Sequence, residues 1–406
     1  MSDPVTIESA VGTVPFGRPN ERRTWYTQGR WWVCYRWDQG GDNDKVLIES
    51  SIDGSAWSYD SSGAVFWKGQ GCTPSGSVIL YTGSFGVALN ESNGEIHCFF
   101  DSHLGSGYRA MIYRMGTCNG DGTITWKTSN AQNVPRYGSC YNNKHPKPVV
   151  DSNGYVWCIA ETWYYNGPQH PVVYRNAAND GSWSDASGFP HALDSTADAY
   201  WATRLVALSG GRVLAYWGLL SSYAKCKLWN GSSWDSEETI AQDGSSEYAT
   251  WACDAVKLPG SDSVLMTYIR SVGGLGGYDY RSKVRALDGA LSSYALLFNE
   301  DSYSLAFTLC PHKGSVCCVR ATSSTISAHS FNNATNNWSN ETPLLSGETG
   351  LDVYGCNPAL QDEGQIALSW HTSGYLVRFL FAEVWPDGFY VLVDWENDKV
   401  FDLEAP

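Results

Sequence analysis

Seven short segments of this chain begin with a turn residue and then carry apolar side chains at the second and fourth positions after it. The turn residues are Gly29, Gly94, Gly154, Gly211, Asp262, Gly314 and Gly364. The apolar pairs that follow them are Trp31 and Val33, Ile96 and Cys98, Val156 and Cys158, Val213 and Ala215, Val264 and Met266, Val316 and Cys318, and Ile366 and Leu368. Because alternate residues of a strand share one face, each segment predicts a strand that buries one face.

The spacing of these segments predicts what kind of unit repeats. Neighbouring turn residues lie between 50 positions (Gly314 to Gly364) and 65 positions (Gly29 to Gly94) apart. Strand-like runs stand before and after most segments, and several repeats close with an Asp-Gly or Asn-Gly turn followed by Trp, as in tight hairpins. Four antiparallel strands per repeat are typical of a propeller blade. We therefore predict an all-β fold, a seven-bladed β-propeller of four-stranded antiparallel blades, with six blades as the alternative.

The repeats use almost the whole length of the chain. We expect residues 1-406 to form one propeller domain, since all-β folds of this size often remain single domains. A strand from Val5 to Ser9 or from Tyr390 to Val393 is expected to close the ring, because an open ring would expose an unpaired edge. The expected blades are residues 14-60, 63-128, 138-186, 193-240, 245-298, 301-345 and 350-395.

The first repeat carries a recognisable turn motif. The segment Ser51-Ile-Asp53-Gly54-Ser-Ala-Trp57 resembles an Asp-box, the BNR repeat turn of sialidase-like propellers, and Arg18-Pro19 and an Asp-rich loop with Asp42 and Asp44 precede it. The resemblance implies a propeller fold and, at the level of activity, a sialidase-like hydrolysis with Asp42 as proton donor. The Tyr and Glu nucleophile pair of that family is not found, and the Asp-box itself is a structural turn.

Composition limits the possible partners. The chain has 27 Lys and Arg against 42 Asp and Glu, a net charge of -15, so nucleic acid is not an expected ligand. It contains 19 Trp and 24 Tyr, some of which are expected to stack on sugars. No apolar run is long enough for a membrane-spanning helix, and the N-terminus does not read as a signal peptide. We expect an extracellular or virion-associated protein.

The 12 cysteines are expected to be mostly buried free thiols. Cys98, Cys158 and Cys318 occupy the same strand position in different repeats, as small core residues do. Spacings typical of a zinc site do not occur. No cofactor is expected: Asp42 and Asp44 stand in a Gly/Asn loop that could hold calcium, but a solvated turn is preferred.

Basic residues recur at one position of the repeat. Seven positions before the turn residues, where an inner strand begins, stand Arg22, Val87, Lys147, Arg204, Ala255, Phe307 and Asn357. If the basic side chains converge at the mouth of a central funnel, they form a site for a carboxylate or sulfate. The alternative is that they pair with acidic residues of neighbouring blades. Arg22, Lys147, Arg204 and Asn357 are the substrate-binding residues that this position suggests.

The third repeat adds groups that could transfer protons. His145 and His170 stand in segments expected at one end of the propeller, near the aromatic residues Trp163, Tyr164 and Trp201. This arrangement resembles propeller-fold polysaccharide lyases of the ulvan-cleaving type, and the resemblance makes Tyr200 and Arg204 further candidates. Two hypotheses follow: an enzyme that cleaves an acidic polysaccharide, lyase-like or sialidase-like, and a non-catalytic glycan- or receptor-binding propeller.

Overall fold

The computed structural model describes residues 5–8, 23–37, 45–67, 70, 72–73, 78–79, 84–104, 109–138, 142–163, 169–194, 203–218, 223–241, 247–248, 254–272, 277–300, 307–312, 314–321, 325–346, 350–354, 365–372, 377–383, 390–394 and 399–403. Side chains are described for fewer residues: those of 5–8, 60–63, 73, 78–79, 102–104, 109, 142–143, 163, 169, 247–248, 271–272 and every residue after 344 are not.

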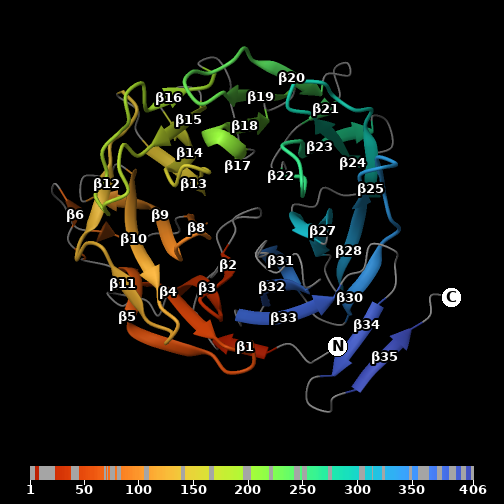
Figure 1. Ribbon diagram of the computed structural model, residues 1–406, viewed down its shortest axis with the longest axis horizontal. Helices are drawn as coiled ribbons and strands as arrows, with labels where there is room; N and C mark the ends of the chain where they lie inside the picture. The colour runs from red at the N-terminus through yellow and green to blue at the C-terminus, as the bar shows by residue number, and fades with distance from the viewer. Residues whose placement is uncertain are drawn as a thin grey trace.

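The fold is a β-propeller, in which sheets surround a central axis (Figure 1). The first sheet contains β2 (Thr24–Thr27), β3 (Arg30–Trp37), β4 (Lys45–Ser51) and β5 (Ser58–Trp67). The next sheet spans two predicted blades and contains β6 (Cys72–Thr73), β7 (Val78–Ile79), β8 (Phe85–Asn90), β9 (Glu95–Leu104), β10 (Arg109–Cys118), β11 (Ile124–Trp126), β12 (Ala131–Val134), β13 (Asn142–Val150), β14 (Val156–Trp163), β15 (Gln169–Arg175) and β16 (His191–Ala192).

Three further sheets continue the ring. One contains β17 (Thr203–Ala207), β18 (Val213–Gly218), β19 (Ala224–Trp229) and β20 (Glu238–Ala241). The next contains β21 (Glu247–Tyr248), β22 (Ala255–Lys257), β23 (Val264–Val272), β24 (Gly277–Arg285) and β25 (Ala295–Glu300). The third contains β26 (Phe307–His312), β27 (Ser315–Ala321), β28 (Thr325–Asn332), β29 (Asn337–Trp338) and β30 (Thr342–Ser346).

The last sheet of the ring combines a strand from the N-terminal part of the sequence with strands from its C-terminal part. It contains β31 (Gly350–Tyr354), β32 (Gln365–Thr372), β33 (Val377–Glu383) and, beside β33, the N-terminal strand β1 (Val5–Glu8). Of the two predicted closing strands the structure therefore uses the N-terminal one. The other, β34 (Tyr390–Asp394), pairs with β35 (Lys399–Leu403) in a hairpin that lies outside the ring in Figure 1.

The number of blades remains a prediction, because the sheet from β6 to β16 runs through two predicted blades. They are joined at a single parallel pair, Arg109 with Asn142. Within the described residues there is no α-helix; the helical element is the 3-10 turn η1 (Ser209–Gly211). None of the helical structure in this part of the chain is long and apolar enough to cross a membrane.

The apolar repeat positions form the core, as predicted. All twelve whose side chains are described are buried, from Trp31 and Val33 in β3 to Val316 and Cys318 in β27. Neighbouring sheets pack their faces together: Trp157 of β14 lies in one cluster with Val213 and Trp217 of β18. Each large side chain buried in this way contributes about 1.5–3 kcal/mol. The predicted free thiols include Cys34, Cys98, Cys158 and Cys318, which are unpaired and buried.

The Asp-box-like segment is a turn between β4 and β5. Asp53 Oδ1 accepts hydrogen bonds from the backbone N–H groups of Ser55 at 2.9 Å and Ala56 at 3.4 Å, and Trp57 Nε1 donates to Gly54 O at 2.9 Å. The backbone hydrogen bond from Ser55 is the largest cause that lowers the pKa of Asp53 to about 2. Gly54 has a φ of 78°, a conformation that glycine adopts without strain. The motif therefore stabilises the turn between β4 and β5.

Candidate functional site

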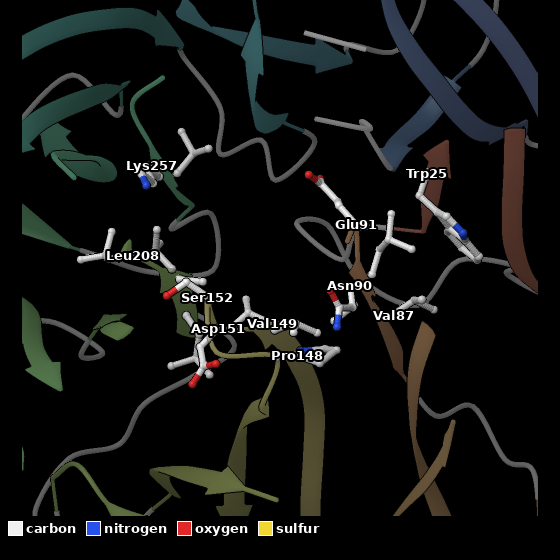
Figure 2. Close-up of a pocket in the computed structure, with 18 of the residues that line it drawn as sticks. Trp25, Val87, Asn90, Glu91, Pro148, Val149, Asp151, Ser152, Leu208 and Lys257 are labelled. Atoms are coloured by element: carbon white, nitrogen blue, oxygen red, sulfur yellow. The ribbon is translucent and has the colours of Figure 1, made fainter. Parts of the chain in front are cut away.

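A cavity of about 1000 Å³ lies along the axis of the propeller. Its wall comes from the inner strands β8, β13, β17 and β22, together with residues of β2 and β26. Figure 2 shows apolar side chains such as Val87, Val149 and Leu208 around it, with the polar side chains of Asn90 and Lys257 among them. Glu91, Asp151 and Ser152, also labelled in Figure 2, add acidic and hydroxyl groups, so polar and apolar groups share the lining about equally.

Two of the predicted basic residues line this cavity. Lys147 of β13 and Arg204 of β17 are 4% and 6% exposed, and both belong to its wall. They come from adjacent parts of the ring, so the structure brings them to one site as the repeat predicted. Arg22 and Asn357, the other two members of the predicted set, lie outside the described residues.

Arg204 is not an isolated positive charge. Its Nε lies 2.9 Å from Oδ1 of Asp254, whose side chain is fully buried just before β22. The other carboxylate oxygen, Oδ2, accepts a hydrogen bond from the backbone N–H of Leu309 at 2.8 Å. The pair therefore ties together β17, β22 and β26. Arg204 thus pairs with an acid of the next predicted blade, as the second interpretation of the basic positions predicts, and the pair reduces the charge that Arg204 offers to a ligand.

His145 has an unusual backbone conformation. It lies in β13 at a register irregularity between Lys144 and Lys147, and its φ is 54°. Non-glycine residues seldom adopt this region, and they persist there only where the surroundings hold them. The imidazole of His145 contacts the residue that directly precedes β8. Ser84 Oγ lies 2.9 Å from His145 Nδ1, and both residues are buried.

His170 lies at the same end of the sheet but on another strand. It is the second residue of β15 and pairs in register with Thr162 of β14, whose hydroxyl donates to the His170 carbonyl at 3.3 Å. β14 thus stands between the strands of the two histidines. His170 is 6% exposed. The described wall of the cavity includes neither histidine, although Pro146 and Lys147 beside His145 belong to it.

The remaining predicted site residues are Trp163, Asp42, Tyr164, Tyr200 and Trp201. Trp163 ends β14, and its side chain is not among those described. Asp42, Tyr164, Tyr200 and Trp201 lie outside the described residues. In the part of the chain whose side chains are described, no group of three acidic, cysteine or histidine residues is arranged to hold a metal ion.

Burial by itself does not mark a functional histidine. His97 of β9 is fully buried, and its Nδ1 lies 2.9 Å from the Tyr113 hydroxyl. Burial lowers the pKa of His97 to about 3, so the ring is neutral and acts as part of the core. His145 differs in its strained backbone and in its position beside the cavity wall.

Sequence reasoning missed Ser84 and Asp254. Asp254 stands directly before Ala255, the entrance position of its repeat, so an acid next to an entrance position was an available signal for the partner of Arg204. Ser84 lies ten positions before Gly94 in a segment without a motif. Nothing in the sequence connects it with His145, 61 residues later.

Comparison with solved structures identifies similar propellers. An ulvan lyase of polysaccharide lyase family PL25 is 10% identical, with a TM-score of 0.59 over 94% of this chain and 96% of that chain. The lectin BP39L from Burkholderia pseudomallei is 10% identical, with a TM-score of 0.58 over 93% and 98%. The polysaccharide lyase Uly1 is 9% identical, with a TM-score of 0.57 over 89% of each chain.

These matches show a shared fold. The predicted likeness to lyase propellers is confirmed at that level. Sialidase structures are also matched, with TM-scores from 0.43 to 0.48. No protein-family model matches the chain, and no curated protein matches its sequence.

Proposed function

We propose that this propeller binds an acidic polysaccharide at the axial cavity, with the acidic group of a sugar beside Lys147. The observation that carries the proposal is that Lys147 and Arg204 lie in the wall of one cavity while His145 is held in a strained conformation two residues away. A buried ammonium group gains most from an anionic partner, because water screens it little. The protein would then meet its ligand outside the cell or on a virion.

In the catalytic form of this proposal the protein is a lyase. A lyase that acts on a uronate takes the proton from the carbon that bears the carboxylate. The bond between the adjacent carbon and the glycosidic oxygen then breaks, a carbon–carbon double bond forms, and the leaving oxygen takes up a proton; a positioned histidine is a common base for the first transfer. His145 is assigned that role, and His170 and Tyr200 remain candidates for the second proton transfer. Polysaccharide lyases among the proteins of similar fold support this form.

The second candidate function is glycan binding without catalysis. It is supported by the Arg204–Asp254 ion pair, which leaves the cavity wall with less positive charge than a clamp for a uronate would have. The lectin of similar fold agrees with it equally well. Trp163, Tyr164 and Trp201 would stack on sugar rings in either form.

Both candidate functions require that the cavity binds an acidic polysaccharide. Binding to a panel of uronate-, sulfate- and sialate-containing polysaccharides, with neutral polysaccharides as a comparison, tests this. Lys147→Met keeps the apolar stem and removes the charge, and we expect it to weaken binding of the acidic ligand by about 2–5 kcal/mol, roughly 30-fold or more. Lys225→Met, at ion pairs with Asp194 and Glu237, is the matched control and should bind as wild type does, because none of these three residues lines the cavity. Equal binding by the Lys147 variant and wild type would refute the site.

His145→Gln separates the two functions. New reducing ends and absorbance from an unsaturated product report cleavage, while calorimetry reports binding. An enzyme should lose at least about 100-fold in turnover while it still binds, because general base catalysis contributes about this much. A wild-type protein that binds but generates neither signal is a lectin-like binder.

A further inference from the structure

The environment of His145 points to a residue that positions it. We infer that Ser84, on the neighbouring part of the ring, is the positioning residue that holds the His145 imidazole in one orientation and one tautomer. The role rests on the proposed function of His145, while the interaction itself can be tested without any polysaccharide. Ser84 does not touch a ligand in this inference; it acts through His145.

The first support is the hydrogen bond. Ser84 Oγ and His145 Nδ1 are 2.9 Å apart, and the two residues are only 2% and 6% exposed. A serine hydroxyl can donate to Nδ1 or accept from it, so the contact fixes the orientation of the ring. A base that takes up a proton at Nε2 carries its own proton on Nδ1, and that N–H then donates to Ser84 Oγ, which gives a single tautomer. Because Ser84 engages Nδ1, exchange of a proton with a ligand is assigned to Nε2.

The second support is that Ser84 is itself held in place. Its carbonyl accepts a hydrogen bond from the Asp101 N–H of β9 at 3.0 Å. Two residues later, at Gly86, β8 approaches β13 so closely that an added Cβ would lie 2.5 Å from Pro146 O and 2.5 Å from Pro148 Cδ. The backbone that carries the hydroxyl therefore has a defined place against the strand that carries the histidine.

The third support is the strain at His145. A left-handed backbone conformation at a histidine is stable only if its surroundings compensate for it. The hydroxyl of Ser84, which comes from the neighbouring predicted blade and bonds the imidazole, is such a compensation. A histidine with only a packing role, such as His97, shows no comparable backbone conformation.

Nuclear magnetic resonance of protein labelled with ¹⁵N at histidine tests the inference. The His145 signals are identified by their loss in His145→Gln. In wild type we expect the two ring nitrogens to give the widely separated shifts of a single tautomer. In Ser84→Ala we expect averaged shifts from two tautomers, and in Ser84→Thr, which keeps the hydroxyl, the wild-type pattern. Ser232→Ala, which removes an exposed hydroxyl from a hairpin turn, should leave the His145 signals unchanged.

Two outcomes would overturn the inference: averaged shifts for His145 in the wild type, or an unchanged His145 pattern in Ser84→Ala. If the alanine variant does not fold, the wild-type spectrum alone still tests the inference, because averaged His145 shifts there would refute it. If wild type cleaves polysaccharide, Ser84→Ala should lower turnover more than it lowers affinity, with recovery in Ser84→Thr. If no polysaccharide is bound or cleaved, the proposed function fails, and the shifts still decide whether Ser84 orients His145.

Discussion

Two Arg–Asp pairs join the β17–β20 sheet to the β22–β25 sheet, one at each end of the inner strands, and they differ in surroundings. Arg204 Nε and Asp254 Oδ1 are 2.9 Å apart, with side chains 7% and 0% exposed. Arg212 and Asp262 approach to 2.6 Å, but their side chains are 25% and 13% exposed. The chemistry is the same, so the difference shows how burial decides what an ion pair contributes.

The buried pair is expensive to break. A charge left without its partner in the protein interior has lost both water and its counter-ion, which costs several kcal/mol. The pair at the turn end keeps part of its hydration, so its loss costs little. The end of the inner strands near Lys147 and His145 is therefore the rigid end of the cavity, where a ligand group can be held in a defined geometry.

The largest expected effect is on the buried pair. Asp254→Ala should lower the free energy of unfolding by about 3–5 kcal/mol, because Arg204 is left buried without its carboxylate. Denaturant unfolding followed by tryptophan fluorescence measures it. Adding Arg204→Met in the same chain should recover much of the loss, since an apolar pair of similar size needs no counter-charge. A loss below 1 kcal/mol for the single variant would contradict the assignment.

A loss of stability of intermediate size is expected for a substitution at Gly86, where β8 contacts β13. Gly86→Ala places a Cβ 2.5 Å from Pro146 O and Pro148 Cδ, and overpacking of this kind costs about 1–3 kcal/mol. Gly277→Ala, whose Cβ would have its nearest contact at 3.3 Å, is the matched control with a smaller loss. Thermal unfolding of both variants provides the comparison, and equal losses would mean that the close approach at Gly86 is not a rigid contact.

The smallest loss of stability is expected for a substitution in the Arg212–Asp262 pair, and this loss depends on pH. Burial opposes ionisation of Asp262, but hydrogen bonds from Lys257 and from Ser209 outweigh it and lower its pKa to about 2. A carboxyl group with a lowered pKa stabilises the fold above its unfolded value near 3.8, and this contribution is lost as pH falls through about 2.

Asp262→Asn should accordingly cost at most about 1 kcal/mol at pH 7, less at high salt, and only a small part of that at pH 2. Urea unfolding at pH 7 and pH 2 with wild type alongside measures the difference. If Asp262→Asn lowered the free energy of unfolding as much as Asp254→Ala does, the two ion pairs would not differ in their contribution to stability.

The fold was predictable because it depends on local, repeated patterns. Alternating apolar positions after each turn residue specified buried strands, and the buried side chains of Val156, Val213 and Val316 agree with them. Site geometry was predictable in part: the repeat register placed Lys147 and Arg204 in one wall. The partner of His145 was not, since Ser84 lies in another predicted blade and no local pattern encodes their contact. Asp254, the partner of Arg204, stands beside an entrance position and could have been found from the sequence.

The strand that closes the ring has a consequence for how the chain folds. Val5 of β1 pairs with Phe379 of β33, 374 positions later (379 − 5). Contacts so distant in sequence form slowly, and during synthesis β1 must wait until nearly the whole chain has been made. Until then the last sheet lacks its outer strand and exposes a free edge to other chains. The expected kinetic signature is a slow final phase, in which the nearly complete ring either takes up its own β1 or pairs with that of another molecule.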